Sequence, residues 1–266
     1  MLLDLIDTEL PLQLLLGLGL GLVFGIAAQI TRFCLRRAVA GEDGPDRPAL
    51  AVWLLALGVA VAATQGLGAL GFVELSGHRW LSADIPLAAI AVGGLMFGAG
   101  MVLTRGCASR LTVLSASGNL RAATVLVVFA IVAHATLKGV LAPVRVAVTE
   151  PTVTLPFATL SHLPILAWLV PVVIIAGAAV LAVRHRVSPG HLGLAGVIGL
   201  VAAGGWAATS VLFFDDFDPA PVQSLAFTSS WSDSLFYTVA ATAIPAGFGT
   251  GLIAGVLLGA FFSAAA

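Results

Sequence analysis

Gly94-Leu95-Met96-Phe97-Gly98, followed after five residues by Thr104-Arg105-Gly106-Cys107, repeats a stretch nearer the start of the chain. The earlier copy is Gly21-Leu22-Val23-Phe24-Gly25, followed after five residues by Thr31-Arg32-Phe33-Cys34. Matched residues are 73 positions apart (107 minus 34), and an arginine, Arg37 or Arg110, follows each cysteine by three residues. Such repeats in a very apolar chain are typical of transporters built from duplicated units.

The composition indicates that the solvent of this chain is lipid. Of 266 residues, 59% are hydrophobic and 9% are charged, whereas soluble domains carry about 25% charged residues. The net charge of −1 gives no support for nucleic-acid binding. Two cysteines form no disulfide framework, and we find no spacing that indicates a metal and no nucleotide-binding motif, so no metal or cofactor is expected. We therefore predict an all-α integral membrane protein.

Seven segments are long and apolar enough to be membrane spans, which need about 20 residues each. They are roughly 11–31, 50–72, 85–104, 121–142, 164–183, 191–213 and 235–262. The last is long and rich in glycine, which favours a broken or strongly tilted helix. No linker divides the chain, so we expect a single permease domain, 1–266, with halves of about 1–142 and 143–266.

The distribution of charge predicts the orientation. Basic residues concentrate in the odd-numbered connections, namely Arg32, Arg36, Arg37, Arg47, Arg105, Arg110, Arg121, Arg184 and Arg186. The sixth connection is acidic, with Asp215, Asp216, Asp218 and Asp233. The positive-inside rule then places the N-terminus outside and the C-terminus in the cytoplasm of a bacterial-type inner membrane. The first ten residues contain three carboxylates and no Lys or Arg, so no cleavable signal peptide is expected.

Thr104, Arg105, Gly106 and Cys107 suit anion binding if the helix breaks there. A helix N-terminus favours anions, glycine permits close approach of a solute, and a guanidinium binds oxyanions through several donors. Nearby positive charge also raises the thiolate fraction of a cysteine. Thiosulfate combines oxyanion oxygens with a soft terminal sulfur, so it fits this combination. The candidate path residues are Cys34, Cys107, Arg105, Gly106, Arg32 and Thr104.

Purely structural interpretations compete with this one. Gly17, Gly21 and Gly25, like Gly94 and Gly98, have the spacing of closely packed membrane helices. A cysteine in such a helix is usually a small apolar residue, and we interpret Arg36, Arg184 and Arg186 as determinants of topology. His134, inside a predicted span, either couples transport to protons or bonds to the backbone of a neighbouring helix.

The chain resembles the YeeE/YedE family of membrane proteins, which take up sulfur-containing compounds. The resemblance is carried by Phe24-Gly25 with Phe33-Cys34, by Gly93 to Gly98 with Gly106-Cys107-Ala108, by Gly118-Asn119-Leu120-Arg121, by Leu225-Ala226-Phe227-Thr228 and by the glycine-rich run 247–260. It covers most of the chain, although 130–220 matches only in hydropathy. Membership implies pseudo-symmetric halves, re-entrant loops that meet near the membrane centre, and cysteines along a thiosulfate path.

The chain departs from the family pattern in its second half. Family members similar to the thiosulfate transporters carry another Gly-Cys element there, but here its cysteine position is Ala264. Two cysteines suffice, or the chain is a shorter relative, or a partner chain completes the path. We expect a permease for a small sulfur-containing anion, not an enzyme, with a cytoplasmic sulfur-carrier or sulfurtransferase as a partner. The alternatives are an intramembrane sulfurtransferase that relays persulfide and a partner subunit of a transporter.

Overall fold

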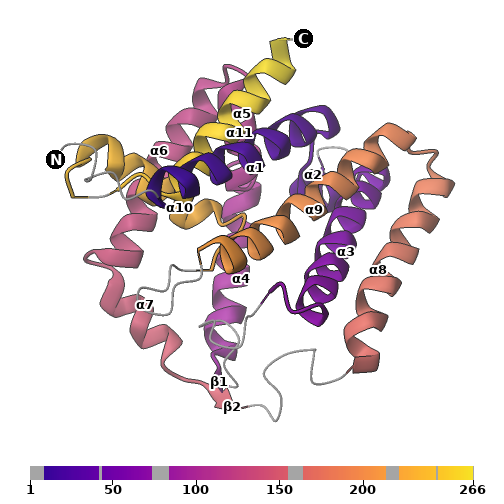
Figure 1. Cartoon of the computed structure of the whole chain (residues 1–266), viewed down its shortest axis with the longest axis horizontal. Helices are drawn as coiled ribbons and strands as arrows, with labels where there is room; N and C mark the ends of the chain where they lie inside the picture. The colour runs from indigo at the N-terminus through magenta and orange to yellow at the C-terminus, as the bar shows by residue number, and fades with distance from the viewer. Residues whose placement is uncertain are drawn as a thin grey trace.

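The computed structural model describes residues 9–41, 44–73, 84–154, 164–213, 222–243 and 245–265 (Figure 1). Its elements are α1 (Glu9–Thr31), α2 (Leu35–Ala40), α3 (Arg47–Ala69), β1 (Asp84–Ile85), α4 (Leu87–Leu103), α5 (Ala108–Ala116), α6 (Leu120–Lys138), α7 (Ala142–Thr149), β2 (Val153–Thr154), α8 (Pro164–Arg184), α9 (Pro189–Leu212), α10 (Phe227–Val239) and α11 (Phe248–Ala265). The strands β1 and β2 pair antiparallel. The all-α class is confirmed, with this one short ribbon added.

Within the described residues, seven segments have the length and composition of membrane spans, as predicted. They are Leu12–Ala40, Arg47–Ala69, Leu87–Ala116, Leu120–Lys138, Ile165–Arg184, Pro189–Leu212 and Phe248–Ala265. The predicted segment 235–262 is broken, because α10 ends at Val239 and α11 begins at Phe248. The acidic residues Asp215, Asp216 and Asp218 and the first eight residues lie outside the described part, and the division into halves near residue 142 stays a prediction.

The tightest helix pair joins the two ends of the described chain. A Cβ on Gly17, Gly21 or Gly25 would clash with the backbone of α11, and a Cβ on Gly251 or Gly255 would clash with the backbone of α1. Gly17, Gly21 and Gly25 lie against Phe248, Leu252 and Val256 in that order, so α1 and α11 run parallel. Small residues permit this close backbone approach, which stabilises helix pairs in lipid.

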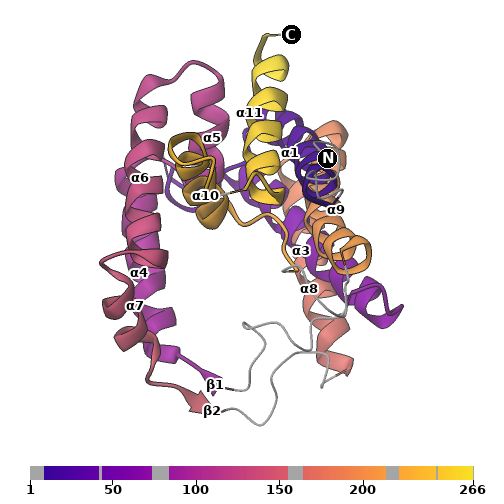
Figure 2. The same ribbon diagram turned by 60° about the vertical axis from the view of Figure 1, so that its left-hand side comes forward.

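The helices form two groups that meet around α5, α10 and α11 (Figure 2). The main buried cluster draws on α1, α3, α5, α9 and α11, and a smaller one joins α5 to α6. The helix α4 buries little of its surface: Leu95 is 77% exposed and Leu103 is 81% exposed. Since these side chains are apolar, we assign this surface of α4 to the lipid.

Candidate functional site

Both cysteines lie at the point where a membrane helix breaks and a new helix begins. Cys34 is the N-cap of α2 and Cys107 is the N-cap of α5, each in extended backbone conformation. Cys34 is buried and Cys107 is half-buried, and both thiols are free. The helix breaks that the anion-binding interpretation requires are therefore present at both repeats.

An arginine makes the turn at each break. Arg32 has φ 51° and Arg105 has φ 61°, in the left-handed region that residues other than glycine seldom adopt. The next residue closes the turn: Phe33 N–H donates to Ala28 O and Gly106 N–H donates to Met101 O, both at 3.0 Å. This six-to-one bond is the helix-ending Schellman pattern. It usually places glycine at the left-handed position, so an arginine there adopts a less favourable backbone conformation.

The structure gives Gly106 a local packing role, and the close approach of a solute to its backbone stays a prediction. Its φ is not positive, so conformational freedom does not explain a glycine here. A Cβ on Gly106 would lie 3.2 Å from Cγ of Arg110, which is closer than such atoms normally approach. Gly106 therefore leaves room for the side chain of Arg110 beside the break.

A cavity of about 340 Å³ lies between the two breaks and is strongly cationic. It is lined by Cys34, Arg36, Arg37, Gly41, Arg105, Arg110, Leu114 and Arg121. The structure thus brings together two of the predicted site residues, Cys34 and Arg105, and adds four arginines. We call it the thiol cavity.

Arg110 relates the thiol cavity to both cysteines. Its guanidinium lies within electrostatic range of the thiolate forms of Cys34 and Cys107. Its Nη1 is buried and has no hydrogen-bond partner among the described residues, and the same holds for Nε of Arg36. A buried N–H group without an acceptor is unfavourable. The site therefore offers charged donors where an anion would satisfy them.

The other predicted path residues do not line the thiol cavity. The Thr104 hydroxyl lies 2.7 Å from Gly100 O and 2.9 Å from Gly106 O, so it stabilises the backbone of the break. Sγ of Cys107 lies 3.2 Å from Oγ of Ser109. Arg32 is exposed and lines a neighbouring cavity.

Arg37 is fixed by a residue that the sequence analysis did not single out. Its Nε lies 2.6 Å from Oδ2 of Asp46, whose Oδ1 accepts a 3.0 Å hydrogen bond from Ala49 N–H at the start of α3. Burial raises the pKa of Asp46, but the bonds from Ala49 and Arg37 and the charge of Arg37 outweigh it and hold that pKa below 3.8. Asp46 is therefore a carboxylate that positions Arg37.

Several cavity arginines were missed as site residues. Arg36 was interpreted as a determinant of topology, yet it lines the thiol cavity. For Arg37 and Arg110 a signal was present, because both copies of the repeat carry an arginine three residues after the cysteine. Arg121 entered the sequence analysis only as part of a motif of the resemblance. Its Nη1 lies 3.4 Å from Thr104 O at the break, and these two residues are 17 positions apart in the sequence.

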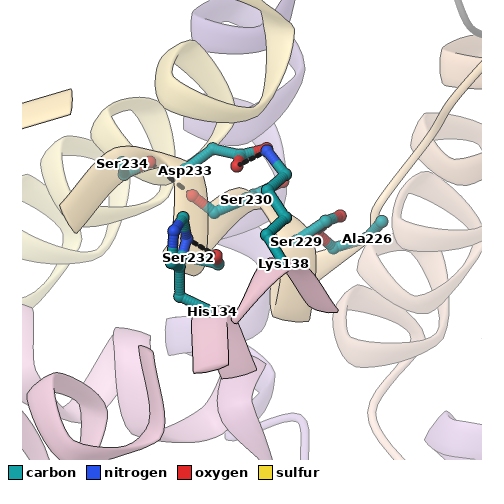
Figure 3. A network of polar contacts seen from close by, with 8 residues as sticks. All are labelled: His134, Lys138, Ala226, Ser229, Ser230, Ser232, Asp233 and Ser234. Atoms are coloured by element: carbon teal, nitrogen blue, oxygen red, sulfur yellow. Dashed lines mark hydrogen bonds and ion pairs between the residues drawn. The ribbon is translucent and has the colours of Figure 1, made fainter. Parts of the chain in front are cut away.

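His134 lies in a separate polar network between α6 and α10 (Figure 3). Its Nδ1 is 3.0 Å from Oγ of the buried Ser232, and its ring stacks on Phe236 with centroids 3.7 Å apart. One turn further, Nζ of Lys138 pairs with Asp233 at 2.9 Å. The expected bond from His134 to a neighbouring helix is present, but its partner is a side-chain hydroxyl and not the backbone.

Broken membrane helices whose ends meet at a cavity are a feature of the transporter class of membrane proteins. A family model described as Sulphur transport matches residues 30–266, and the chain belongs to this family, YeeE/YedE. A search among curated proteins gave no match. The resemblance found in the sequence is confirmed, and the chain is a membrane transporter for a sulfur compound.

Proposed function

We propose that the chain is a permease for a small sulfur-containing anion, thiosulfate, which passes between Cys34 and Cys107. The observation that carries this proposal is Arg110, which lines the thiol cavity with Cys34 and has a buried Nη1 without a hydrogen-bond partner among the described residues. A guanidinium in the same cavity as a soft sulfur atom matches a solute that has charged oxygens and a terminal sulfur. Sulfate offers the oxygens alone, so the thiols provide selectivity.

The dimensions and charge of the thiol cavity support a small anion. Its volume of about 340 Å³ is at the lower end of the roughly 300–1,000 Å³ typical of ligand sites. Arg105 on its wall offsets the charge of the solute, while Thr104 and Gly106 maintain the break that presents Cys107. Arg32 offsets charge in the neighbouring cavity, and His134 is the candidate for proton coupling.

The orientation proposed from the sequence remains N-terminus outside and C-terminus in the cytoplasm of an inner membrane. The parallel course of α1 and α11 supports termini on opposite sides, because both helices then cross in the same direction. Residues of the first and third connections line the thiol cavity together. This supports the placement of both basic connections on the same side of the membrane. A cytoplasmic sulfur-carrier or sulfurtransferase would receive the solute there.

Uptake of ³⁵S-thiosulfate into proteoliposomes tests the proposal. We expect Cys34→Ala, Cys107→Ala and Arg110→Gln each to reduce uptake by about tenfold or more, since each removes a contact to a charged solute. Arg145→Gln is the matched control, because this arginine is exposed and its side chain bonds to Thr136 O, away from both cysteines. Uptake by Cys107→Ala equal to that of the parent would show that sulfur contact is not part of the mechanism.

The same preparation separates the two alternative functions. In a persulfide relay, a cysteine thiolate attacks the terminal sulfur of thiosulfate, the S–S bond breaks, and sulfite leaves with the electron pair. Mass spectrometry would then find one added sulfur on the protein, without uptake. A partner subunit would show neither uptake nor added sulfur until a second membrane chain is supplied. We expect uptake without a stable added sulfur.

A further inference from the structure

The α8–α9 junction is a third break with the geometry of the two cysteine breaks. Arg186 has φ 51°, and Val187 N–H donates to Ala182 O at 3.0 Å, as Gly106 N–H does to Met101 O. Among the described residues other than glycine, Arg32, Arg105 and Arg186 are those with positive φ. The next helix begins after Ser188, its N-cap. Ser188 therefore occupies the position of Cys107, 81 residues further on (188 minus 107).

This third break contributes to a second cavity, which we call the serine cavity. It has a volume of about 460 Å³ and adjoins the thiol cavity through Arg37, which lines both. Its polar lining includes Arg32, Arg37, Arg186, His185, His191 and Ser188. Among the described lining residues none carries a carboxylate or a thiol. Asp46 offsets the charge of Arg37, but it is not part of the wall, so the lining itself remains cationic.

We infer that the serine cavity binds a tetrahedral oxyanion through its oxygen atoms. Guanidinium groups from two breaks provide several N–H donors around one space, a geometry suited to oxyanions. Ser188 supplies a hydroxyl, a hard donor, where the other two breaks supply a soft sulfur. The cavity therefore does not distinguish sulfate from thiosulfate. A free inorganic oxyanion and the phosphate of a lipid headgroup share this chemistry.

The inference goes beyond the proposed permease function and does not depend on it, because no cysteine lines the serine cavity. It predicts two neighbouring anion sites of different selectivity. The thiol cavity prefers a solute with a terminal sulfur. The serine cavity accepts oxyanions generally.

Binding of ³⁵S-sulfate to the purified full chain tests the inference. The assay uses a Cys34→Ser, Cys107→Ser chain in neutral detergent, so that the thiols of the permease proposal contribute nothing. Arg186→Asn removes the guanidinium and keeps a residue that tolerates the left-handed conformation. We expect it to weaken sulfate binding by about tenfold or more. Arg184→Asn is the matched control, because Arg184 is exposed, lies two residues away and does not line the cavity. We expect the sulfate affinity of Arg184→Asn to stay within about twofold of the affinity of the cysteine-free chain.

The outcomes are distinguishable from those of the uptake assay. Absence of sulfate binding to a monodisperse, helical protein would overturn the inference, and so would equal loss in Arg184→Asn and Arg186→Asn. Thiosulfate should displace bound sulfate with similar affinity, and a strong preference for thiosulfate in the cysteine-free chain would contradict the hard-donor assignment. In nanodiscs, displacement of sulfate by phosphatidylglycerol identifies a lipid phosphate as the occupant, whereas undiminished binding identifies a free ion. A second variant, Arg32→Asn, should match Arg186→Asn.

Discussion

Asp46 is a single carboxylate on which the arrangement of both cavities depends, because its partner Arg37 lines each of them. It also caps α3 through the Ala49 N–H. Asparagine caps helices about as well as aspartate. The variant Asp46→Asn therefore keeps the cap and removes the charge that positions Arg37, whereas Asp46→Ala removes both.

We expect Asp46→Asn to lower the stability of the folded protein by about 0.5 kcal/mol at neutral pH, as is usual for a partly exposed ion pair. The pKa of Asp46 is below 3.8 in the folded protein, so its charge contributes fully above that value. The contribution is lost as the pH falls through the folded pKa. The thermal unfolding temperatures of parent and variant in detergent should therefore become equal in acid. A difference that persists unchanged in acid well below the folded pKa would contradict this assignment.

At the residue scale, the sequence singled out Cys34 and Arg105, which line the thiol cavity, but assigned Arg36 and Arg186 to topology. The physical reason is that one arginine beside a membrane span serves either purpose. Arginines on a connection satisfy the positive-inside rule, and the same arginines line a cavity when two connections lie close together in the fold. Only the three-dimensional approach of the connections distinguishes the two roles.

Helix α1 and helix α4 show how equal sequence elements acquire different environments. Gly21 and Gly94 are matched positions of the repeat. A Cβ on Gly21 would clash with the carbonyl of Leu252 in α11, whereas a Cβ on Gly94 meets nothing within 4 Å. The glycine spacing thus predicted close packing correctly for α1 and wrongly for α4 within the described chain.

We expect Gly21→Ala to destabilise the protein by about 1–3 kcal/mol, the usual cost of overpacking. Gly94→Ala, its matched control, should change stability by about 0.5 kcal/mol or less. Thermal unfolding monitored by circular dichroism in one detergent compares the two. Equal losses in both variants would mean that α4 is as tightly packed as α1.

The break between α8 and α9 could not be found by searching the sequence for further copies of the cysteine repeat. Val183 to Ser188 contains neither glycine nor cysteine, so it does not match the other two copies by residue type. Its match is one of backbone geometry, the left-handed Arg186 and the closing bond to Ala182 O. The Ser188-Pro189 pair was the available signal, since serine at the N-cap and proline at the first position begin many helices.

In the whole molecule, the basic connections gather at one end. The thiol cavity combines residues of the first and third connections, and the serine cavity combines residues of the first and fifth. The β1–β2 ribbon lies at the opposite end from the α5–α6 turn (Figure 2). The count of spans and the sidedness of charge were thus predictable from composition. The meeting of three connections was not, because it depends on contacts between distant segments.

A labelling experiment checks the proposed orientation. In a chain with Cys34 and Cys107 replaced by serine, Ser117→Cys reports the α5–α6 turn and Glu150→Cys reports the ribbon end, both at exposed positions. We expect a membrane-impermeant maleimide added to intact cells to label Glu150→Cys at once and Ser117→Cys only after permeabilisation. The reverse pattern would place the basic end outside and contradict the orientation.

The close pairing of α1 with α11 also constrains biosynthesis. Gly17 contacts Phe248, so more than two hundred residues separate the two halves of this interface along the chain. A ribosome adding about 5–20 residues per second needs on the order of 10–50 s to supply the second half. During that interval the glycine-lined side of the first helix has no permanent neighbour, and the insertion machinery or lipid must cover it until synthesis reaches the last helix.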